Sequence, residues 1–315
     1  MEGRRPPHGQ VSRPTGRILV IRGGAIGDFI LTLPVLAALR AQFPEARLEV
    51  LGYAHIAQLA LAGGLADAVR SIEARSLAGF FARDGQLHPE LQDYFAGFAI
   101  IISYLYDPDQ FFRLNVARSS PAQFIQGPHR PDELAGFHAT EVLLKPLERL
   151  AIFDSDPVPR LALNPQPTTP NQLALHPGSG SERKNWPEAN WAQLLKRLGA
   201  SSSVRFLLVG GEAEGDRLNR LAQWLPAERV ELARNLPLVD LAKRLAACDA
   251  FVGHDSGITH LAAAVGLGGL VLWGETAHSV WAPRSQRMKV LAAPGGLSAL
   301  SVESVAGELS LLTAS

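Results

Sequence analysis

Short apolar runs alternate with helix-like segments twice along this chain, and this alternation constrains the fold more than any other feature. In the first half, residues 17–21 are typical of a buried strand, residues 28–42 carry apolar side chains at helical spacing, and residues 47–51 are typical of a second strand. This order predicts a parallel sheet with helices on its faces, because parallel strands need a crossover between them. Residues 98–102 are expected to add a further strand.

A proline-rich segment separates the two halves. Residues 154–172 lack helical periodicity and contain proline at every few positions, which indicates an interdomain linker. After it the alternation restarts, with strands expected at 173–175, 205–209, 250–252 and 269–273 and helices at 188–198, 215–224, 237–247 and 258–265. A chain of 315 residues also exceeds what one hydrophobic core normally supports. We therefore expect an α/β protein with two Rossmann-like open parallel-sheet domains, residues 17–153 and 173–296, facing a cleft.

The two ends of the chain are expected to differ in order. Residues 1–16 mix arginines with prolines and glycines and are predicted to be a flexible basic tail. No secretory or membrane segment is expected, because the apolar run that follows the tail is interrupted by Arg22. This favours a cytoplasmic protein, with peripheral contact of the tail with the anionic inner membrane surface as the alternative. Residues 297–315 are expected to form a C-terminal helix that packs back on the first domain.

Charge and cysteine content exclude some classes of protein. The 30 basic and 30 acidic residues balance, which argues against a general nucleic-acid binder. The single cysteine, Cys248, cannot form an internal disulfide, and its apolar setting predicts a buried structural role.

Three loops that follow predicted strands carry candidate functional residues. The first, residues 23–28, is rich in glycine but does not fit the dinucleotide-binding pattern, because Arg22 stands where that pattern needs glycine. No phosphate-binding Gly-Lys-Ser/Thr follows either. Asp28 either caps the next helix or faces a ligand.

The other two loops are suited to an anion. Residues 176–187 combine glycines and serines with Arg183 and Lys184, which could bind a diphosphate. Residues 253–260 place Asp255 and Ser256 at a predicted helix start, where unpaired N–H groups favour negative charge.

No metal site is expected from the spacing of candidate ligands. His254 and His260 are six residues apart and do not share a helix face as two histidines four residues apart do. The pair Asp107 and Asp109 is similar to a metal-holding Asp-x-Asp motif of sugar-nucleotide enzymes. The proline between them favours an ordinary turn.

Taken in order, these motifs resemble one known family. Ile18-Leu-Val-Ile-Arg-Gly-Gly-Ala-Ile-Gly-Asp28 with Leu-Thr-Leu-Pro34, His176-Pro-Gly-Ser-Gly with Lys184-Asn-Trp-Pro187, Asp255-Ser-Gly-Ile-Thr-His260 and Gly274-Glu-Thr276 are similar to motifs of the ADP-heptose:lipopolysaccharide heptosyltransferases, glycosyltransferase family 9. The resemblance runs from about residue 17 to the last helix. It implies a GT-B architecture and an inverting, metal-independent glycosyltransferase that needs no cofactor beyond its nucleotide-sugar co-substrate.

The resemblance also implies roles for individual residues. The catalytic base would be Asp28, and the acceptor side would include Arg22, Gly23 and Gly24. Donor binding would fall to Ser179, Ser181, Arg183, Lys184, Glu212 (or Glu214), Leu236, Asp255, Ser256, Gly257 and His260. The implied partners are an ADP-linked sugar, with heptose favoured, and a glycolipid or oligosaccharide acceptor such as the lipopolysaccharide core.

Two other functions remain open at this point. One is a nucleotide-sugar-binding protein without turnover in an envelope-glycan assembly pathway, which would have little need for Asp28. The other is a nicotinamide oxidoreductase, disfavoured by Arg22 and by the absence of an acidic residue after the predicted strand that ends at Leu51.

Overall fold

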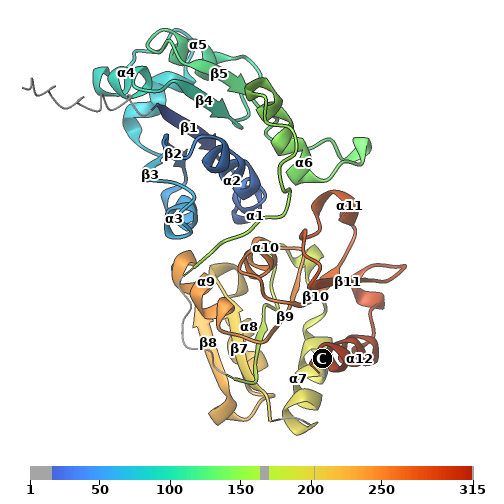
Figure 1. The fold of residues 1–315 in the computed structure, drawn as a ribbon. Helices are drawn as coiled ribbons and strands as arrows, with labels where there is room; N and C mark the ends of the chain where they lie inside the picture. The colour runs from blue at the N-terminus through green and yellow to red at the C-terminus, as the bar shows by residue number, and fades with distance from the viewer. Residues whose placement is uncertain (1–15, 164–169, 202, 314–315) are drawn as a thin grey trace, which may run out of the picture.

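The first half of the chain forms a parallel sheet, as the sequence predicts. The computed structural model describes residues 16–163, 170–201 and 203–313. Its first sheet has five strands in the order β3-β2-β1-β4-β5 (Figure 1). Their bounds are β1 Arg17–Arg22, β2 Arg47–Gly52, β3 Ala68–Ser71, β4 Ile100–Ser103 and β5 Gln123–Gln126. In the register, Val20 of β1 pairs with Val50 of β2 on one side and Ile102 of β4 on the other.

Helices cover both faces of this sheet. Ile18 and Val20 pack on one face, with α1 (Ile26–Ile30), α2 (Leu33–Gln42), α3 (Ala54–Ala62) and α6 (Ala139–Leu144). Leu19 and Ile21 pack on the other, with α4 (Pro89–Ala96) and α5 (Phe111–Ala117). The middle of β1, Ile18 to Ile21, is apolar throughout because it is buried on both faces.

The helix expected over residues 28–42 is divided in two. The structure starts α1 two residues earlier, at Ile26, and interrupts the helix at Leu31 and Thr32. The cause is Pro34, which has no N–H to donate to the carbonyl four residues before it and is tolerated only in the first turn of α2. Asp28 consequently lies inside the short first helix.

The second half forms a six-stranded parallel sheet in the order β11-β10-β9-β6-β7-β8. Its strands are β6 Gln172–Leu175, β7 Arg205–Gly210, β8 Val230–Arg234, β9 Ala250–His254, β10 Gly269–Trp273 and β11 Met288–Ala292. The connecting helices include α7 Glu188–Ser201, α8 Arg217–Ala222, α9 Leu238–Ala246, α10 Gly257–Ala264 and α11 His278–Trp281. Counted within this half, the strand order is that of the dinucleotide-binding Rossmann fold.

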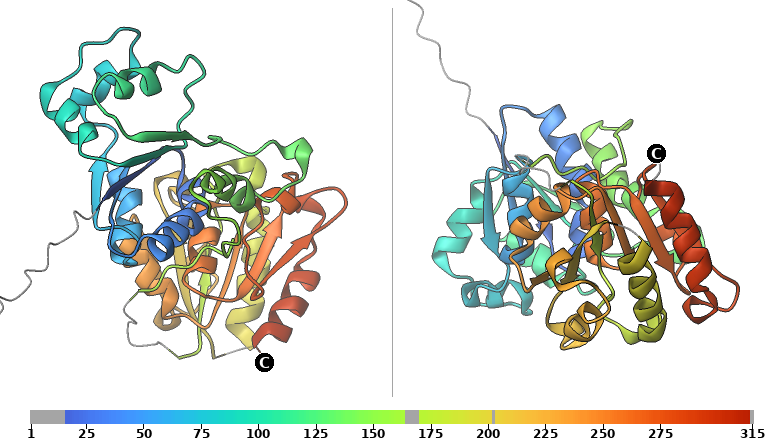
Figure 2. Two further views of the ribbon diagram at one scale, coloured as in Figure 1. Left: turned by 45° about the horizontal axis from the view of Figure 1, so that its top comes forward. Right: turned by 90° about the horizontal axis from the view of Figure 1, so that it is seen from below.

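The C-terminal helix does not pack on the first domain, so that expectation is wrong. Helix α12 (Val302–Thr313) contacts α7 and β10 of the second domain, and Figures 1 and 2 show it beside α7. Val302, Val305 and Leu309 recur at helical spacing and are buried in the same apolar cluster as Leu270 and Leu272. Burial of this apolar face holds the helix on the second sheet.

The linker and the predicted tail are only partly described. The tail lies outside the described residues, apart from Gly16, as do residues 164–169 of the linker. Residues 154–163 form no helix or strand, and Leu161 N–H donates to Ala264 O of α10 at 2.8 Å. The linker thus contacts the second domain before that domain's first strand begins at Gln172.

The two domains meet where α1 and α10 begin. A Cβ atom on Gly257 would lie 2.7 Å from Ile26 Cβ and 2.9 Å from Gly27 N, closer than real Cβ contacts allow. Glycine at position 257 is therefore what lets the two helices approach. No helix in the described part of the chain is long and apolar enough to cross a membrane.

Candidate active site

A cleft opens where the two sheets face each other. In each sheet the strand order reverses beside the first strand, between β1 and β4 and between β6 and β9, and ligands bind beyond the carboxyl ends of strands at such points. The loops after these four strands line a cleft of about 560 Å³. It is lined from the first domain by Arg22, Asp28, Tyr106 and His129 and from the second by Lys184, Asp255, Thr276 and Trp281, among others.

Asp28 is the carboxylate that the first domain brings to the cleft. Its Oδ2 accepts a hydrogen bond from Ala25 N–H at 2.9 Å, so it caps α1, and its side chain is 30% exposed in the cleft lining. The Nη2 atom of Arg22 lies 3.4 Å from Asp28 Oδ1, and the Arg22 side chain is only 4% exposed. Burial lowers the pKa of Arg22, and the Asp28 carboxylate opposes that shift. Asp28 thus combines a capping role with a position open to ligand.

Arg22 is held by backbone carbonyls as well as by Asp28. Its Nη1 donates to His129 O at 2.9 Å, and its Nε donates to Asp28 O at 3.3 Å. This fixed guanidinium places a permanent positive charge behind the carboxylate.

A second group of polar side chains faces Asp28 from the other domain. Lys184 Nζ lies 2.6 Å from Asp255 Oδ2, and the hydroxyl of Thr276 donates to the same oxygen at 2.7 Å. The Asp255 side chain is 11% exposed and the Lys184 side chain 39%. Asp255 therefore orients the ammonium group while leaving it accessible from the cleft.

A second cavity adjoins the cleft. Its volume is about 570 Å³, and it shares Gly24, Ser179, Ser256 and Gly257 with the cleft lining. Apolar side chains from α9 and from the β8–α9 loop line its inner part, including Leu236, Leu238 and Leu241. The site thus has two adjoining compartments, one polar and one more apolar.

Buried histidines support the loops between the compartments. Burial lowers the pKa of His176 to about 3 and that of His260 to about 4. His176 Nδ1 lies 3.3 Å from the hydroxyl of Ser256, which caps α10 by accepting from Thr259 N–H. Both histidines are neutral at pH 7, so they add no positive charge to the site.

Most of the residues expected from the sequence converge on these two compartments. The cleft is lined by Arg22, Gly23, Gly24, Asp28, Ser179, Lys184, Asp255, Ser256, Gly257 and His260, and the second cavity by Leu236. Three predicted donor-binding residues, Ser181, Arg183 and Glu212, line neither compartment.

Two of these three have a local explanation. Arg183 is exposed within a short 3₁₀ turn, Glu182–Lys184, whose one-residue step turns its side chain away from that of Lys184. The second cavity is lined by Glu214 and not by Glu212. Glu214 is buried, and its carboxylate accepts a hydrogen bond from Gly211 N–H at 2.6 Å. Glu214 was the alternative expected from the sequence.

Sequence reasoning missed other lining residues. Tyr53 and His55, from the loop after β2 and the start of α3, bring the first domain to the second cavity. Their place after a predicted strand was the signal that could have found them. Asn235 could not be found this way, because it follows β8, a strand that was not predicted.

The Asp107 pair behaves as a turn. Asp107 accepts from the N–H groups of Phe112 and Arg113, at 3.2 and 3.0 Å, and so caps α5. Among the residues that the structure describes, no group of three or more His, Cys, Asp or Glu side chains could hold a metal ion.

Comparisons with known proteins find relatives among the glycosyltransferases. Residues 149–303 match the family model of glycosyltransferase family 9 (heptosyltransferase). Lipopolysaccharide heptosyltransferase 1 of Pseudomonas aeruginosa is 40% identical over 131 residues, which are 41% of this chain and 33% of that protein. A putative glycosyltransferase of Haemophilus influenzae is 25% identical over 79% of each chain. The chain thus aligns with about a third of the length of the Pseudomonas relative.

Solved structures share the whole fold. Heptosyltransferase WaaC of E. coli with ADP superimposes with a TM-score of 0.75 at 20% identity, covering 94% of this chain and 99% of that one. E. coli ADP-heptose lps heptosyltransferase II gives a TM-score of 0.75 at 18% identity, covering 94% and 98%. The architecture is therefore the two-domain GT-B type. Residues 149–303 thus match glycosyltransferase family 9, and the chain as a whole shares the fold of these two heptosyltransferase structures.

Proposed function

We propose that this protein is an inverting, metal-independent glycosyltransferase that moves heptose from ADP-heptose to a saccharide or lipopolysaccharide-core acceptor. The observation that carries the proposal is the position of Asp28. A carboxylate from one domain and the Lys184–Asp255–Thr276 group from the other line the same cleft, which connects with a second cavity. This arrangement supplies a base, a cation for the leaving group and space for a nucleoside.

The proposed reaction is a single displacement. Asp28 removes the proton from an acceptor hydroxyl as that oxygen attacks the anomeric carbon of the donor sugar. The bond from this carbon to the diphosphate oxygen breaks, and the diphosphate leaves with the electron pair. Attack from the face opposite the leaving group inverts the anomeric configuration.

Positive groups of the second domain stabilise the departing diphosphate. The ammonium of Lys184 lies in the cleft, and the first-turn N–H groups of α10 have no helical carbonyl to bind. Such preorganised donors lower the energy of a developing negative charge without a metal ion.

The names of the relatives support ADP as the nucleotide and heptose as the sugar. WaaC is described with ADP, and its match covers nearly the whole chain. The curated relatives include lipopolysaccharide heptosyltransferases, which favours a lipopolysaccharide-core acceptor. An acceptor anchored in a membrane is consistent with a cytoplasmic enzyme that contacts the inner membrane surface peripherally.

Calorimetric titration of the purified protein with ADP, UDP, GDP and NAD, each with and without EDTA, tests the proposal. Selective ADP binding that EDTA does not change supports it, and transfer of heptose from ADP-heptose would then be measured by product mass. Preference for UDP or GDP would remove ADP-heptose as the donor, and loss of binding in EDTA would contradict metal independence. ADP binding without transfer to any core acceptor would instead support the binding protein without turnover.

Replacing Lys184 by Met is expected to lower kcat/KM for the donor by about 10²-fold, because one preorganised cation is lost from the leaving group. The remaining groups, Asp255 and Thr276, keep their mutual hydrogen bond. Steady-state kinetics with varied donor concentration measure the change. Lys196→Met on the exposed face of α7 is the matched control, because it removes the same charge outside the cleft. Equal kcat/KM of the two variants would show that Lys184 does not act on the donor.

A further inference from the structure

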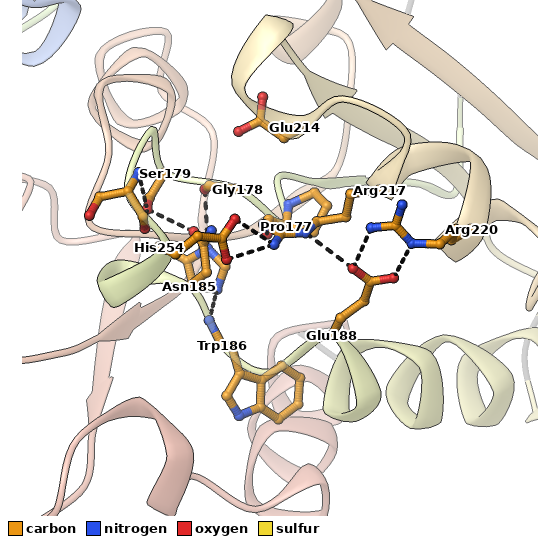
Figure 3. Close-up of polar contacts among 12 residues, drawn as sticks. Pro177, Gly178, Ser179, Asn185, Trp186, Glu188, Glu214, Arg217, Arg220 and His254 are labelled. Atoms are coloured by element: carbon orange, nitrogen blue, oxygen red, sulfur yellow. Dashed lines mark hydrogen bonds and ion pairs between the residues drawn. The ribbon is translucent and has the colours of Figure 1, made fainter.

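The loop that carries Ser179 and Lys184 has little secondary structure of its own. Between β6 and α7 it contains only the 3₁₀ turn Glu182–Lys184, yet both of these side chains reach the cleft. A segment of this kind keeps one conformation only if groups from outside it hold its ends. Figure 3 shows two such groups, one from β9 and one from α8.

His254, the last residue of β9, binds both ends of the loop. Its Nε2 accepts from Trp186 N–H at 2.9 Å, and its Nδ1 lies 3.1 Å from Gly178 O (Figure 3). An amide N–H can only donate and a carbonyl can only accept, so Nδ1 carries the proton and Nε2 is bare. A single neutral tautomer satisfies both bonds.

The surroundings of His254 favour that neutral form. The side chain is fully buried, and the ring of Trp191 meets it edge to face with centroids 5.6 Å apart. Burial lowers its pKa to about 4, an effect that the hydrogen bond to Gly178 O opposes. Protonation would also leave Trp186 N–H without an acceptor.

The outer side of the loop is held by ion pairs. Arg217 of α8 donates to both carboxylate oxygens of Glu182 at 2.8 Å, and Arg220 binds Glu188 at 2.7 and 2.8 Å (Figure 3). The Glu182 side chain is 76% exposed, so solvent weakens this contact. The buried histidine is therefore the stronger of the two supports.

The residues that His254 hydrogen-bonds are close in the chain to Ser179 and Lys184, which are expected to bind the donor. Gly178 precedes Ser179, whose hydroxyl donates to Asn185 Oδ1 at 2.7 Å, and Asn185 lies between Lys184 and Trp186. His254 also precedes Asp255, the partner of Lys184. His254 thus bonds to both ends of the loop that carries Ser179 and Lys184 and is the chain neighbour of the residue that pairs with Lys184.

We propose that His254 is a positioning residue that closes the loop of residues 178–186 and thereby places Ser179 and Lys184 for the donor diphosphate. The role at the diphosphate rests on the proposed function. This role predicts that changes at His254 weaken binding of the diphosphate but not of the nucleoside, because the second cavity is built mainly from other segments.

Three variants separate the two hydrogen bonds. In His254→Asn the side-chain amide nitrogen stands near the place of Nδ1 and can bind Gly178 O, whereas in His254→Gln the side-chain oxygen stands near that of Nε2 and can bind Trp186 N–H. His254→Ala provides neither bond. We expect His254→Ala to raise the Kd for ADP by about 10- to 100-fold and leave the Kd for adenosine unchanged, with the Asn and Gln variants in between.

A control separates positioning from stability. Val252→Ala removes a buried apolar side chain from the same strand, β9, and leaves both hydrogen bonds of His254 in place, so it is expected to bind ADP like the unchanged protein. All titrations are made below the melting temperature of each variant. Equal losses of ADP and adenosine affinity in His254→Ala, or no loss at all, would overturn the positioning role.

A spectroscopic measurement tests the two hydrogen bonds of His254 without any nucleotide. With ¹⁵N-labelled histidine at pH 7, the ring of His254 is expected to give the signature of the neutral Nδ1–H tautomer, assigned by its absence in His254→Gln. The Nε2–H tautomer or a charged ring would overturn the inference. If the unchanged protein binds none of the nucleotides, the proposed function fails, while this spectrum still tests the hydrogen bonds to Gly178 and Trp186.

Discussion

Asp28→Asn is expected to reduce kcat for sugar transfer by about 10²- to 10⁴-fold, the contribution typical of a general base, while ADP affinity stays nearly unchanged. The asparagine Oδ1 can still accept from Ala25 N–H, so the cap of α1 is kept and only the basic carboxylate is lost. Single-turnover transfer assays and calorimetry on the same preparation measure the two quantities. Loss of ADP binding together with activity would show that Asp28 is a structural cap alone.

The Asp28 variant also changes the surroundings of Arg22, and its controls account for this. The buried guanidinium loses its carboxylate partner at 3.4 Å, so the melting temperature should fall. Assays are therefore made well below that temperature. Asp107→Asn is the matched control, because Asp107 likewise caps a helix of the first domain through its carboxylate but does not line the cleft. Its transfer rate is expected to equal that of the unchanged protein.

The parts of the fold predicted from sequence were those with strong local patterns. The apolar strands around Val20 and Phe251 are buried on both faces of their sheets, and such strands are visible as continuous apolar runs. Strand β8 was missed because it lies at the sheet edge, and its exposed Glu231 and Leu232 form no such run. The sequence of α12 alone does not determine which domain the helix packs on, because that depends on which sheet has an uncovered apolar face.

The sequence identified most residues of the candidate site but not the contacts between residues that are far apart in the chain. Lys184 and Asp255 were both identified, but their contact across 71 positions emerges only from the adjacent strands β6 and β9. The same holds for His254, which was considered from the sequence only as a metal ligand, whereas the fold shows its two bonds to the loop after β6. Tertiary contacts of this kind have no signature in spacing along the chain.

A second large effect is expected from acid. His176, His254 and His260 lie in the second domain, and burial lowers the pKa of each, to about 3, about 4 and about 4. In the unfolded chain a histidine has a pKa of about 6.5. As the pH falls from 6.5 towards 4, the unfolded chain takes up protons that the folded chain does not, so the free energy of unfolding decreases. At pH 5.5 the loss is about 1.4 kcal/mol per histidine, or about 4 kcal/mol for the three.

Urea unfolding at pH 7.5 and pH 5.5, followed by tryptophan fluorescence, measures this loss. All 5 tryptophans lie between residues 186 and 281, so the signal reports on the second domain. His176→Gln removes one of the three groups and is expected to reduce the pH-dependent change by about a third, whereas His88→Gln, at an exposed position in the first domain, should leave it unaltered. Carboxylates titrate mainly below this pH range and contribute little to the difference. An equal free energy of unfolding at both pH values would show that these histidines take up protons in the folded protein by pH 5.5, and it would contradict their lowered pKa values.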